Sequence, residues 1–316
     1  MTNRIPLSTL SISLGLAGLA ELWSETGRAL RWGDAIGQAF WALAAIVWVL
    51  TIVTHSIRGA GSKESFASQL KNPVQGPVAA IWPIVGMILG ENLERYWSLG
   101  GRVLVIASIV ASALFAAWLM AHFMNDGLKL DSVHGAYFLP VAAASFVAAA
   151  VLPSIGMSGA ATGAFFVGVL FWIFTFALFF SRLAFGGPFP GPLAPTIAIM
   201  AAPPVVAGAA WFGLSGSRLD AVDYWLAATT VLMLLVQLAL VPRYVKLAFT
   251  LGFWSFTFPF AYAGVYGIEW LDIVKPAGWQ PIVLAILASV TVLIAVIAVK
   301  SVLLVSRGRA HRRTAA

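Results

Sequence analysis

The chain has 316 residues, of which 60% carry hydrophobic side chains and only 10% carry a charge, and its mean hydropathy is +0.92. Ordinary soluble domains carry roughly 25% charged residues, so this composition excludes a soluble globular fold and indicates an integral membrane protein. The net charge is +7, and the absence of cysteine excludes disulfides, thiolate nucleophiles and thiolate metal sites.

The first apolar run, 5–24, follows the basic residue Arg4, as the apolar core of a signal peptide follows its basic region. The run continues through Trp23 without a convincing small-residue cleavage site. This continuity favours a first membrane span that is kept, with a signal peptide as the alternative.

Nine more apolar runs follow, each close to the length that crosses a bilayer as a helix. The ten predicted spans are 5–24, 35–57, 73–92, 102–124, 135–153, 159–182, 193–214, 222–241, 245–267 and 279–305. The intervening loops are about fifteen residues or shorter, and no GxxxxGK[ST] stretch is present, which argues against an ATP-driven pump. We predict a single transmembrane domain over 1–316 that ends in a basic tail at 306–316.

The distribution of lysine and arginine predicts the orientation, because cytoplasmic loops collect these residues. With both termini in the cytoplasm, thirteen of the 19 basic residues fall on the cytoplasmic side. They are Arg4, Arg58, Lys63, Lys71, Lys129, Arg182, Arg243, Lys246, Lys300, Arg307, Arg309, Arg312 and Arg313. The opposite side holds Arg28, Arg31, Arg95, Arg102, Arg218 and Lys275. An even number of spans in the inner (plasma) membrane, with cytoplasmic N- and C-termini, satisfies this bias.

Prolines lie inside the odd-numbered spans and near the edges of the even-numbered ones. The interior prolines are Pro77, Pro83, Pro140, Pro195, Pro203, Pro204 and Pro259. A proline within a helix frees a carbonyl and bends the axis, and irregular backbone at membrane depth is tolerated where protein buries it or a cavity hydrates it. We therefore predict an all-α membrane protein of five helical hairpins in a quasi-five-fold arrangement, with kinked inner helices around a central pore. The alternative is an ordinary bundle in which the prolines only ease helix packing.

Ionisable side chains, which catalysis, metal binding or proton transfer would need, are scarce in the predicted spans. Glu21 and Glu91 lie near outer span ends and are interpreted as rim charges rather than proton relays. The histidines lie at helix ends, in a loop or in the tail, without metal-ligand spacing; they are His55, His122, His134 and His311. No serine–histidine–acid set is evident either. We expect no cofactor, no metal site and no enzymatic activity, and we expect the basic tail to meet anionic lipid headgroups rather than nucleic acid.

A pore lined by neutral side chains has no site that binds an ion tightly, so it favours the passage of ions over their tight binding. The excess of basic residues at the cytoplasmic rim attracts anions toward that mouth. These features indicate an anion pathway.

Four stretches are similar, in order and spacing, to the odd-numbered helices of one known family. They are IPLSTLSISLGLAGLAELW, NPVQGPVAAIWPIVGMILG, HGAYFLPVAAASF and FWSFTFPFAYAG. The chain resembles the tellurite-resistance/dicarboxylate transporter (TDT) family over nearly its whole length; this family includes bacterial TehA, fungal malate transporters and plant slow anion channels. The resemblance implies a ten-helix protomer of five hairpins, a pore through each protomer, and a homotrimer.

The resemblance also implies a gate, because the family occludes its pore with the phenylalanine of a W-x-x-T-F-P pattern on the ninth helix. That phenylalanine is Phe258 here. The flanking positions are Trp254, Ser255, Thr257, Pro259 and Tyr262. Further candidates for inner-helix kinks and the pore wall are Ser11, Gly15, Pro83, Pro140 and Pro203. The family often has glycine where this chain has Ser11, so the pore wall there departs from the pattern. The plant channels carry phosphorylation control in long termini, and we do not expect that control here.

Spacing divides the aromatic residues of this stretch into two stripes. Phe253, Phe256 and Phe260 share a face suited to packing on neighbouring helices, whereas Trp254, Phe258 and Tyr262 are spaced four apart on another. Pro259 cannot donate a hydrogen bond to the carbonyl of Ser255, so we expect the helix to bend beside Phe258.

The leading hypothesis is a gated channel for small anions such as chloride or nitrate. The alternative is a carrier that couples a C4-dicarboxylate or an oxyanion such as tellurite to protons, for which Glu21 or a water-linked His134 is the candidate relay. A membrane enzyme is a third hypothesis from a different class. The expected partners are small inorganic or carboxylate anions, membrane lipid and two further copies of the chain.

Overall fold

The computed structural model describes residues 5–60 and 65–314, and the side chains of 5–58 and 65–306. Arg4 and Lys63, and the side chains of the predicted tail from Arg307 onward, lie outside these ranges. All elements in the described part of the chain are helical.

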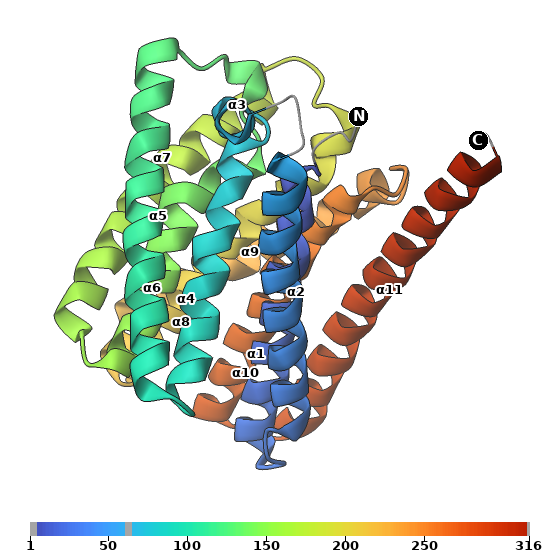
Figure 1. The fold of residues 1–316 in the computed structure, drawn as a ribbon. Helices are drawn as coiled ribbons and strands as arrows, with labels where there is room; N and C mark the ends of the chain where they lie inside the picture. The colour runs from blue at the N-terminus through green and yellow to red at the C-terminus, as the bar shows by residue number, and fades with distance from the viewer. Residues whose placement is uncertain (1–4, 61–64, 315–316) are drawn as a thin grey trace.

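The longer helices are α1 (Ser11–Leu30), α2 (Ala35–Ala60), α3 (Phe66–Lys71), α4 (Ile81–Glu94), α5 (Ser98–Asp126), α6 (Ala144–Val151), α7 (Ser158–Phe185), α8 (Ala202–Ser215), α9 (Ala221–Tyr244), α10 (Thr257–Val274) and α11 (Trp279–Thr314). Shorter helical stretches are η1 (Leu7–Leu10), η2 (Gly76–Ala80), η3 (Leu130–Ser132), η4 (Gly135–Phe138), η5 (Leu139–Ala143), η6 (Leu152–Ile155), η7 (Gly191–Ala201) and η8 (Leu251–Phe256). Figure 1 shows that α1 begins and α11 ends at the same end of the bundle.

Within the described residues, nine helical stretches are long and apolar enough to cross a membrane. They match nine of the predicted spans with ends displaced by a few residues, so the chain is an all-α, multi-pass membrane protein. The predicted span 245–267 is not among the nine. Its helix starts only at Leu251 and runs to Val274, and its last turns carry Glu269 and Asp272, which lower its hydropathy.

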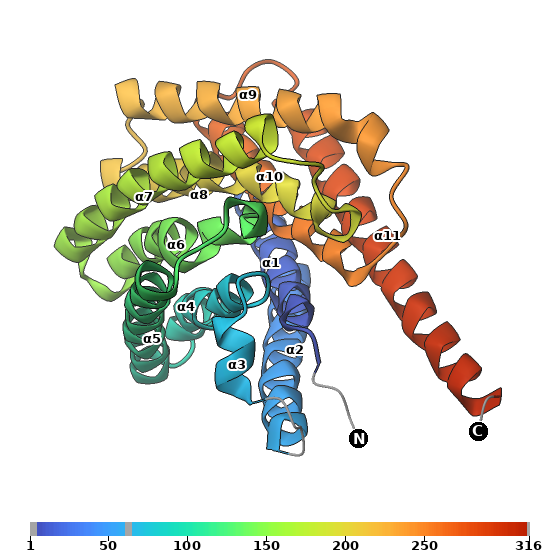
Figure 2. The same ribbon diagram turned by 90° about the horizontal axis from the view of Figure 1, so that it is seen from above.

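Burial divides the helices into two sets. For each of the nine stretches we compare the buried share of its apolar 18-residue segment. This share is 67% to 78% in Leu7–Leu30, Gly76–Glu94, Gly135–Ile155 and Gly191–Ser215, and 17–28% in the other five. The helices α1, α4, α6, α8 and α10 form a closed ring, in which each contacts the next and α10 contacts α1. Each also packs on the long helix that follows it in the chain, as α1 does on α2 and α10 on α11. The view from above in Figure 2 shows α2, α5, α7 and α9 outside this inner group.

Each inner helix begins with a short irregular stretch before regular α-helix. The change occurs after η1, η2, η5, η7 and η8; η5 is a π-helix and the others are 3-10 helices. The prolines stand in or next to these stretches. Pro259, for example, is the third residue of α10, where backbone N–H groups have no intrahelical partner. The backbone changes from 3-10 to α-helix at Thr257, two residues before the proline, and the expected bend at Pro259 stays a prediction.

Two features of the helices were not predicted. The six-residue α3 begins after Ser65, whose side chain accepts a hydrogen bond from the Ser68 amide. Helix α11 continues to Thr314, beyond the predicted end at 305, and leans away from the bundle toward its C-terminal end (Figures 1 and 2).

Candidate pore and its closure

The irregular starts of the inner helices surround a cavity of about 450 Å³. Residues from all five inner segments line it, and no aspartate, glutamate, lysine or arginine is among the lining side chains of residues 5–58 and 65–306. Because 3-10 turns leave backbone groups less regularly paired, this region is also where a hydrated path is best tolerated at membrane depth.

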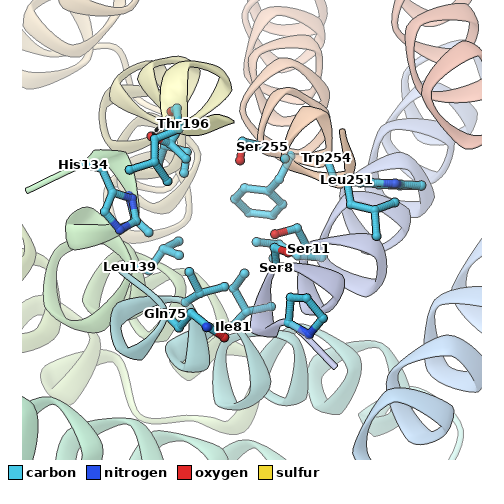
Figure 3. A pocket seen from close by; sticks show the side chains of 18 of the residues that line it. Ser8, Ser11, Gln75, Ile81, His134, Leu139, Thr196, Leu251, Trp254 and Ser255 are labelled. Atoms are coloured by element: carbon cyan, nitrogen blue, oxygen red, sulfur yellow. Dashed lines mark hydrogen bonds between the residues drawn. The ribbon is translucent and has the colours of Figure 1, made fainter. Parts of the chain in front are cut away.

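Neutral polar side chains line the cavity from several directions (Figure 3). They are Ser8, Ser11, Gln75, His134, Thr196, Thr250 and Ser255. Hydroxyl and amide N–H groups donate to an anion without adding a fixed charge. The wall therefore offers many weak contacts and no strong one.

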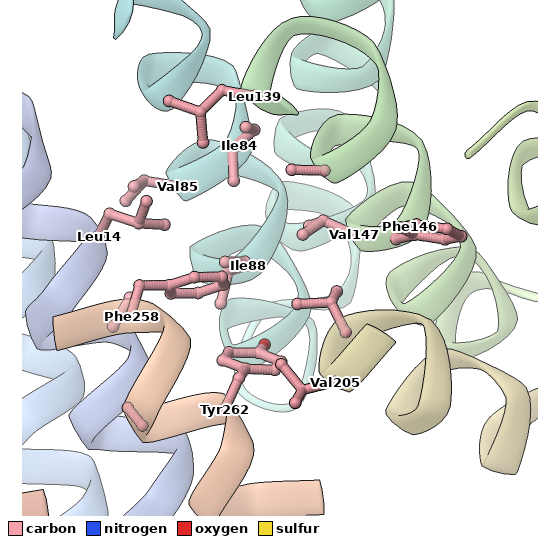
Figure 4. Packing of buried hydrophobic residues seen from close by; sticks show 14 of the residues in the cluster. Leu14, Ile84, Val85, Ile88, Leu139, Phe146, Val147, Val205, Phe258 and Tyr262 are labelled. Carbon is pink, nitrogen blue, oxygen red and sulfur yellow. The ribbon is translucent and has the colours of Figure 1, made fainter. Parts of the chain in front are cut away.

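Apolar side chains pack together around Phe258, which is one of the residues that line the cavity. The Phe258 ring is 5% exposed and extends from α10 between α1 and α4 toward Ile88, with Leu14 and Val85 beside it (Figure 4). The ring of Tyr262 lies one turn further along α10, with its centroid 4.5 Å from that of Phe258. Apolar side chains packed in this way leave little room for water.

The predicted gate-flanking residues take different positions. Ser255 and Pro259 line the cavity beside Phe258. Trp254 also lines it, but its indole N–H donates to Ser301 Oγ of α11 at 2.9 Å. Thr257 is fully buried and donates to the Trp254 carbonyl at 2.7 Å. Of the predicted stripe, Trp254 and Phe258 line the same cavity and the ring of Phe258 lies against that of Tyr262, although Trp254 belongs to the 3-10 stretch η8 and the other two to α10.

Of the five pore-wall candidates, Ser11 lines the cavity. Gly15 faces Thr257 and Trp254 in the contact between α1 and α10. Pro83 lines a separate hollow on the side of α4 toward Trp48 and α5. The remaining two, Pro140 and Pro203, are buried in η5 and in the first turn of α8. These four residues shape the backbone and the packing instead of contacting the cavity.

Sequence reasoning missed most of the polar lining. Thr196 and Thr250 were not singled out, and His134 was considered as a loop residue and as the candidate proton relay of a carrier, not as part of a neutral pore wall. Each stands near the start of an odd-numbered span, where a neutral polar residue precedes the apolar run. That recurrence is the signal that could have identified them.

His134 is the titratable side chain in the cavity wall. It is 1% exposed, its Nε2 donates to the Val74 carbonyl at 3.0 Å, and its Nδ1 accepts from the Ala136 amide at 3.4 Å. Burial lowers the pKa of His134 to about 4, although the bond to Val74 opposes this shift. With both ring nitrogens engaged, the neutral imidazole fits the site and the cation does not.

This arrangement predicts a pH-dependent stability. The unfolded chain binds a proton at His134 below about pH 6.5, whereas the folded chain does so only near pH 4, so stability is complete above pH 6.5 and falls as the pH drops toward 4. The slope is at most about 1.4 kcal/mol per pH unit. Melting temperatures of detergent-solubilised protein between pH 7 and pH 4.5 should fall more steeply for the wild type than for His134→Gln. Equal slopes would contradict the assignment.

Charged residues occur at the other end of the inner helices, beyond the constriction. Arg28 binds Glu21 at 2.7 Å and Glu25 at 2.5 Å, so the Glu21 carboxylate is engaged in an ion pair. Oε2 of Glu269 on α10 is buried without a hydrogen-bond partner among the described residues. No group of three His, Asp or Glu side chains that could hold a metal is found in the part of the chain that the structure describes.

A ring of inner helices around a cavity whose described lining side chains include no aspartate, glutamate, lysine or arginine is typical of a membrane channel or transporter. The sequence matches the family model described as voltage-dependent anion channel (SLAC1) over residues 4–302, and the chain belongs to this family. It is also 26% identical to the tellurite resistance protein TehA homolog of Haemophilus influenzae over 264 residues, which cover 83% of this chain and 80% of that protein. Both matches agree with the predicted TDT family. Members of this family are channels and transporters for anions, and the protein is not an enzyme.

Proposed function

We propose that this protein is a passive, gated channel for small monovalent anions such as chloride and nitrate, with Phe258 closing a neutral pore through each protomer. The observation that carries the proposal is the cavity of about 450 Å³, which Phe258 lines and whose lining, among the described residues, has no acidic or basic side chain apart from neutral His134. A wall of weak donors holds an anion loosely enough for it to leave again.

The proposal includes the finer architecture that the family resemblance implies. The ten helical segments form five hairpins around the pore, the protomers assemble as a homotrimer, and both termini face the cytoplasm of the inner membrane. The contacts of α1, α4, α6, α8 and α10 in a closed order support the five-fold arrangement. The excess of basic residues at the end where the termini lie supports the orientation.

A proton-coupled carrier for a dicarboxylate or for tellurite is the second candidate, and the name of the Haemophilus relative favours it. Two observations in the site weigh against it. Among the described lining residues a dianion finds no cation, and the two candidate relays are engaged, Glu21 with Arg28 and His134 with backbone groups at both ring nitrogens.

Bilayer recordings from purified protein separate the two candidates. We expect a current that follows the chloride or nitrate gradient and is unchanged when a pH gradient is imposed, because both candidate relays, Glu21 and His134, are engaged by other groups. Glu21→Gln should leave this independence intact. Anion flux that follows the pH gradient, and that fails in Glu21→Gln, would instead establish the carrier.

A further inference from the structure

A second hollow, of about 720 Å³, lies on the outer surface of the bundle between α9 and α11. Its floor is the reverse face of the gate-bearing segment, formed by Phe253 and Phe256 of η8 and Phe260 of α10. Leu238 of α9 and Leu293 of α11 stand on opposite walls. Helix α11 diverges from the bundle on this side (Figure 2), which leaves the groove open to the surrounding bilayer.

The interior of the groove suits a hydrocarbon chain. Apart from Lys300 at one end, its polar lining side chains are Gln237 and Tyr244. These two are buried and bonded to each other, because Tyr244 OH donates to Gln237 Oε1 at 2.7 Å. The floor rings pack in sequence, with centroids 5.6 Å apart for Phe253 and Phe256 and 6.3 Å apart for Phe256 and Phe260. Among the described side chains that line the groove, these two polar ones are already hydrogen-bonded, so an acyl chain can lie against them at little desolvation cost.

Basic residues gather at the end of the groove that faces the chain termini. Lys300 Nζ lies 5.8 Å from the ring centroid of Phe249, and Lys246 stands between the lining residues Val245 and Leu247. Arg243 is in the last turn of α9. All three are exposed, and none forms an ion pair within the described part of the chain. Long basic side chains with apolar stems reach from such a position to the level of phospholipid headgroups.

We propose that this groove binds one anionic phospholipid of the leaflet at this end. An acyl chain lies along Phe253, Phe256 and Phe260, and the headgroup phosphate lies between Lys246 and Lys300. The ligand therefore contacts the reverse face of the segment whose other face carries Phe258.

Charge complementarity favours a lipid over a second copy of the chain as the occupant. A second copy would have to present free acidic groups to the cations at the rim. The described acidic residues at this end are Asp126 and Asp131, and each has a partner: Asp126 binds His122 at 2.8 Å, and Asp131 binds Arg182 at 3.4 Å. An anionic lipid supplies both the phosphate for the cations and the hydrocarbon for the floor.

Native mass spectrometry of the purified protein in detergent tests the proposal. The protein is incubated with phosphatidylglycerol or with phosphatidylcholine of the same acyl chains, and the lipid retained per protomer is counted. We expect the wild type to retain phosphatidylglycerol preferentially, and Lys246→Ala and Lys300→Ala each to reduce its retention about fivefold. Leu238→Trp, on an exposed wall position of α9, should obstruct the groove and lower the retention of both lipids.

Lys129→Ala is the matched control, because Lys129 is an exposed lysine at the same end of the bundle but outside the groove. It should retain phosphatidylglycerol as the wild type does. Equal retention of the two lipids by the wild type, or an equal loss in the control, would overturn the site. So would variants that change the number of associated protomers and leave lipid retention unchanged, because the groove would then be a contact between copies. The measurement involves no ion conduction, so its outcome is independent of the channel proposal.

Discussion

Replacing Phe258 with alanine is expected to increase the anion conductance of the reconstituted protein about tenfold or more, since lowering a barrier by about 1.4 kcal/mol changes a rate tenfold. The ring is the apolar floor of the neutral cavity and fills the space between Leu14 and Ile88. Its removal widens the constriction and allows water, and with it an anion, to enter. Single-channel or liposome-flux measurements with chloride and nitrate would report the change.

Two variants on the same helix control for the effect of losing an aromatic ring. Phe260→Ala is the same substitution two positions later, on the face that lines the outer groove, and should leave conductance near the wild-type level. Tyr262→Ala removes the ring behind Phe258, and conductance should stay low because Phe258 still closes the path. If Phe258→Ala folds and conducts no better than these two controls, Phe258 is not the gate.

Much of the fold could be predicted because a bilayer simplifies the problem. Twenty consecutive apolar residues form a helix wherever the backbone must satisfy its own hydrogen bonds, and nine of the ten predicted runs are such helices. The prolines lie inside the odd-numbered spans, and these are the segments that the structure buries. The share of buried residues, for example, is larger in Gly191–Ser215 than in Ala221–Tyr244.

The local backbone could not be predicted to the same depth. The proline pattern predicted kinked α-helices, whereas the inner segments begin as 3-10 or π-helix and turn into α-helix near residues such as Ser11 and Thr257. Proline is compatible with both forms at these positions, since its missing N–H is unpaired either way. The short α3 was missed because six residues carry too little periodicity to identify a helix.

The candidate site, like the fold, could be predicted from the sequence only in part. Nothing in the spacing of the aromatic stretch distinguishes Phe258 from Trp254, and it was the resemblance to the family that singled Phe258 out. The structure shows that the two rings part, one toward Ile88 and the other toward Ser301. Thr196 and Gln75 join the wall from segments far apart in sequence, so only the assembled fold brings them to one cavity.

The contact between α1 and α10 should be the most sensitive packing site near the gate. A methyl group added at Gly15 would overlap the hydroxyl of Thr257 and come within 2.8 Å of its Cβ and 3.0 Å of the Trp254 ring. Thr257 cannot easily turn away, since it is fully buried and its hydroxyl donates to the Trp254 carbonyl. Small residues allow membrane helices to approach closely, and without them the association weakens.

We therefore expect Gly15→Ala to destabilise the protein by about 1–3 kcal/mol, the usual cost of overpacking a well-filled interior, and Gly15→Leu to prevent normal folding. Gly163→Ala is the matched control, because Gly163 lies within α7 and a methyl group there would meet nothing within 4 Å. In that open position alanine is the better helix former, and the control should be more stable by roughly 0.5–1 kcal/mol. Thermal unfolding in detergent should thus move in opposite directions for the two alanine variants. A shift of the same sign and size in both would show that the effect comes from helix propensity and not from the packing of α1 on the segment that carries Phe258.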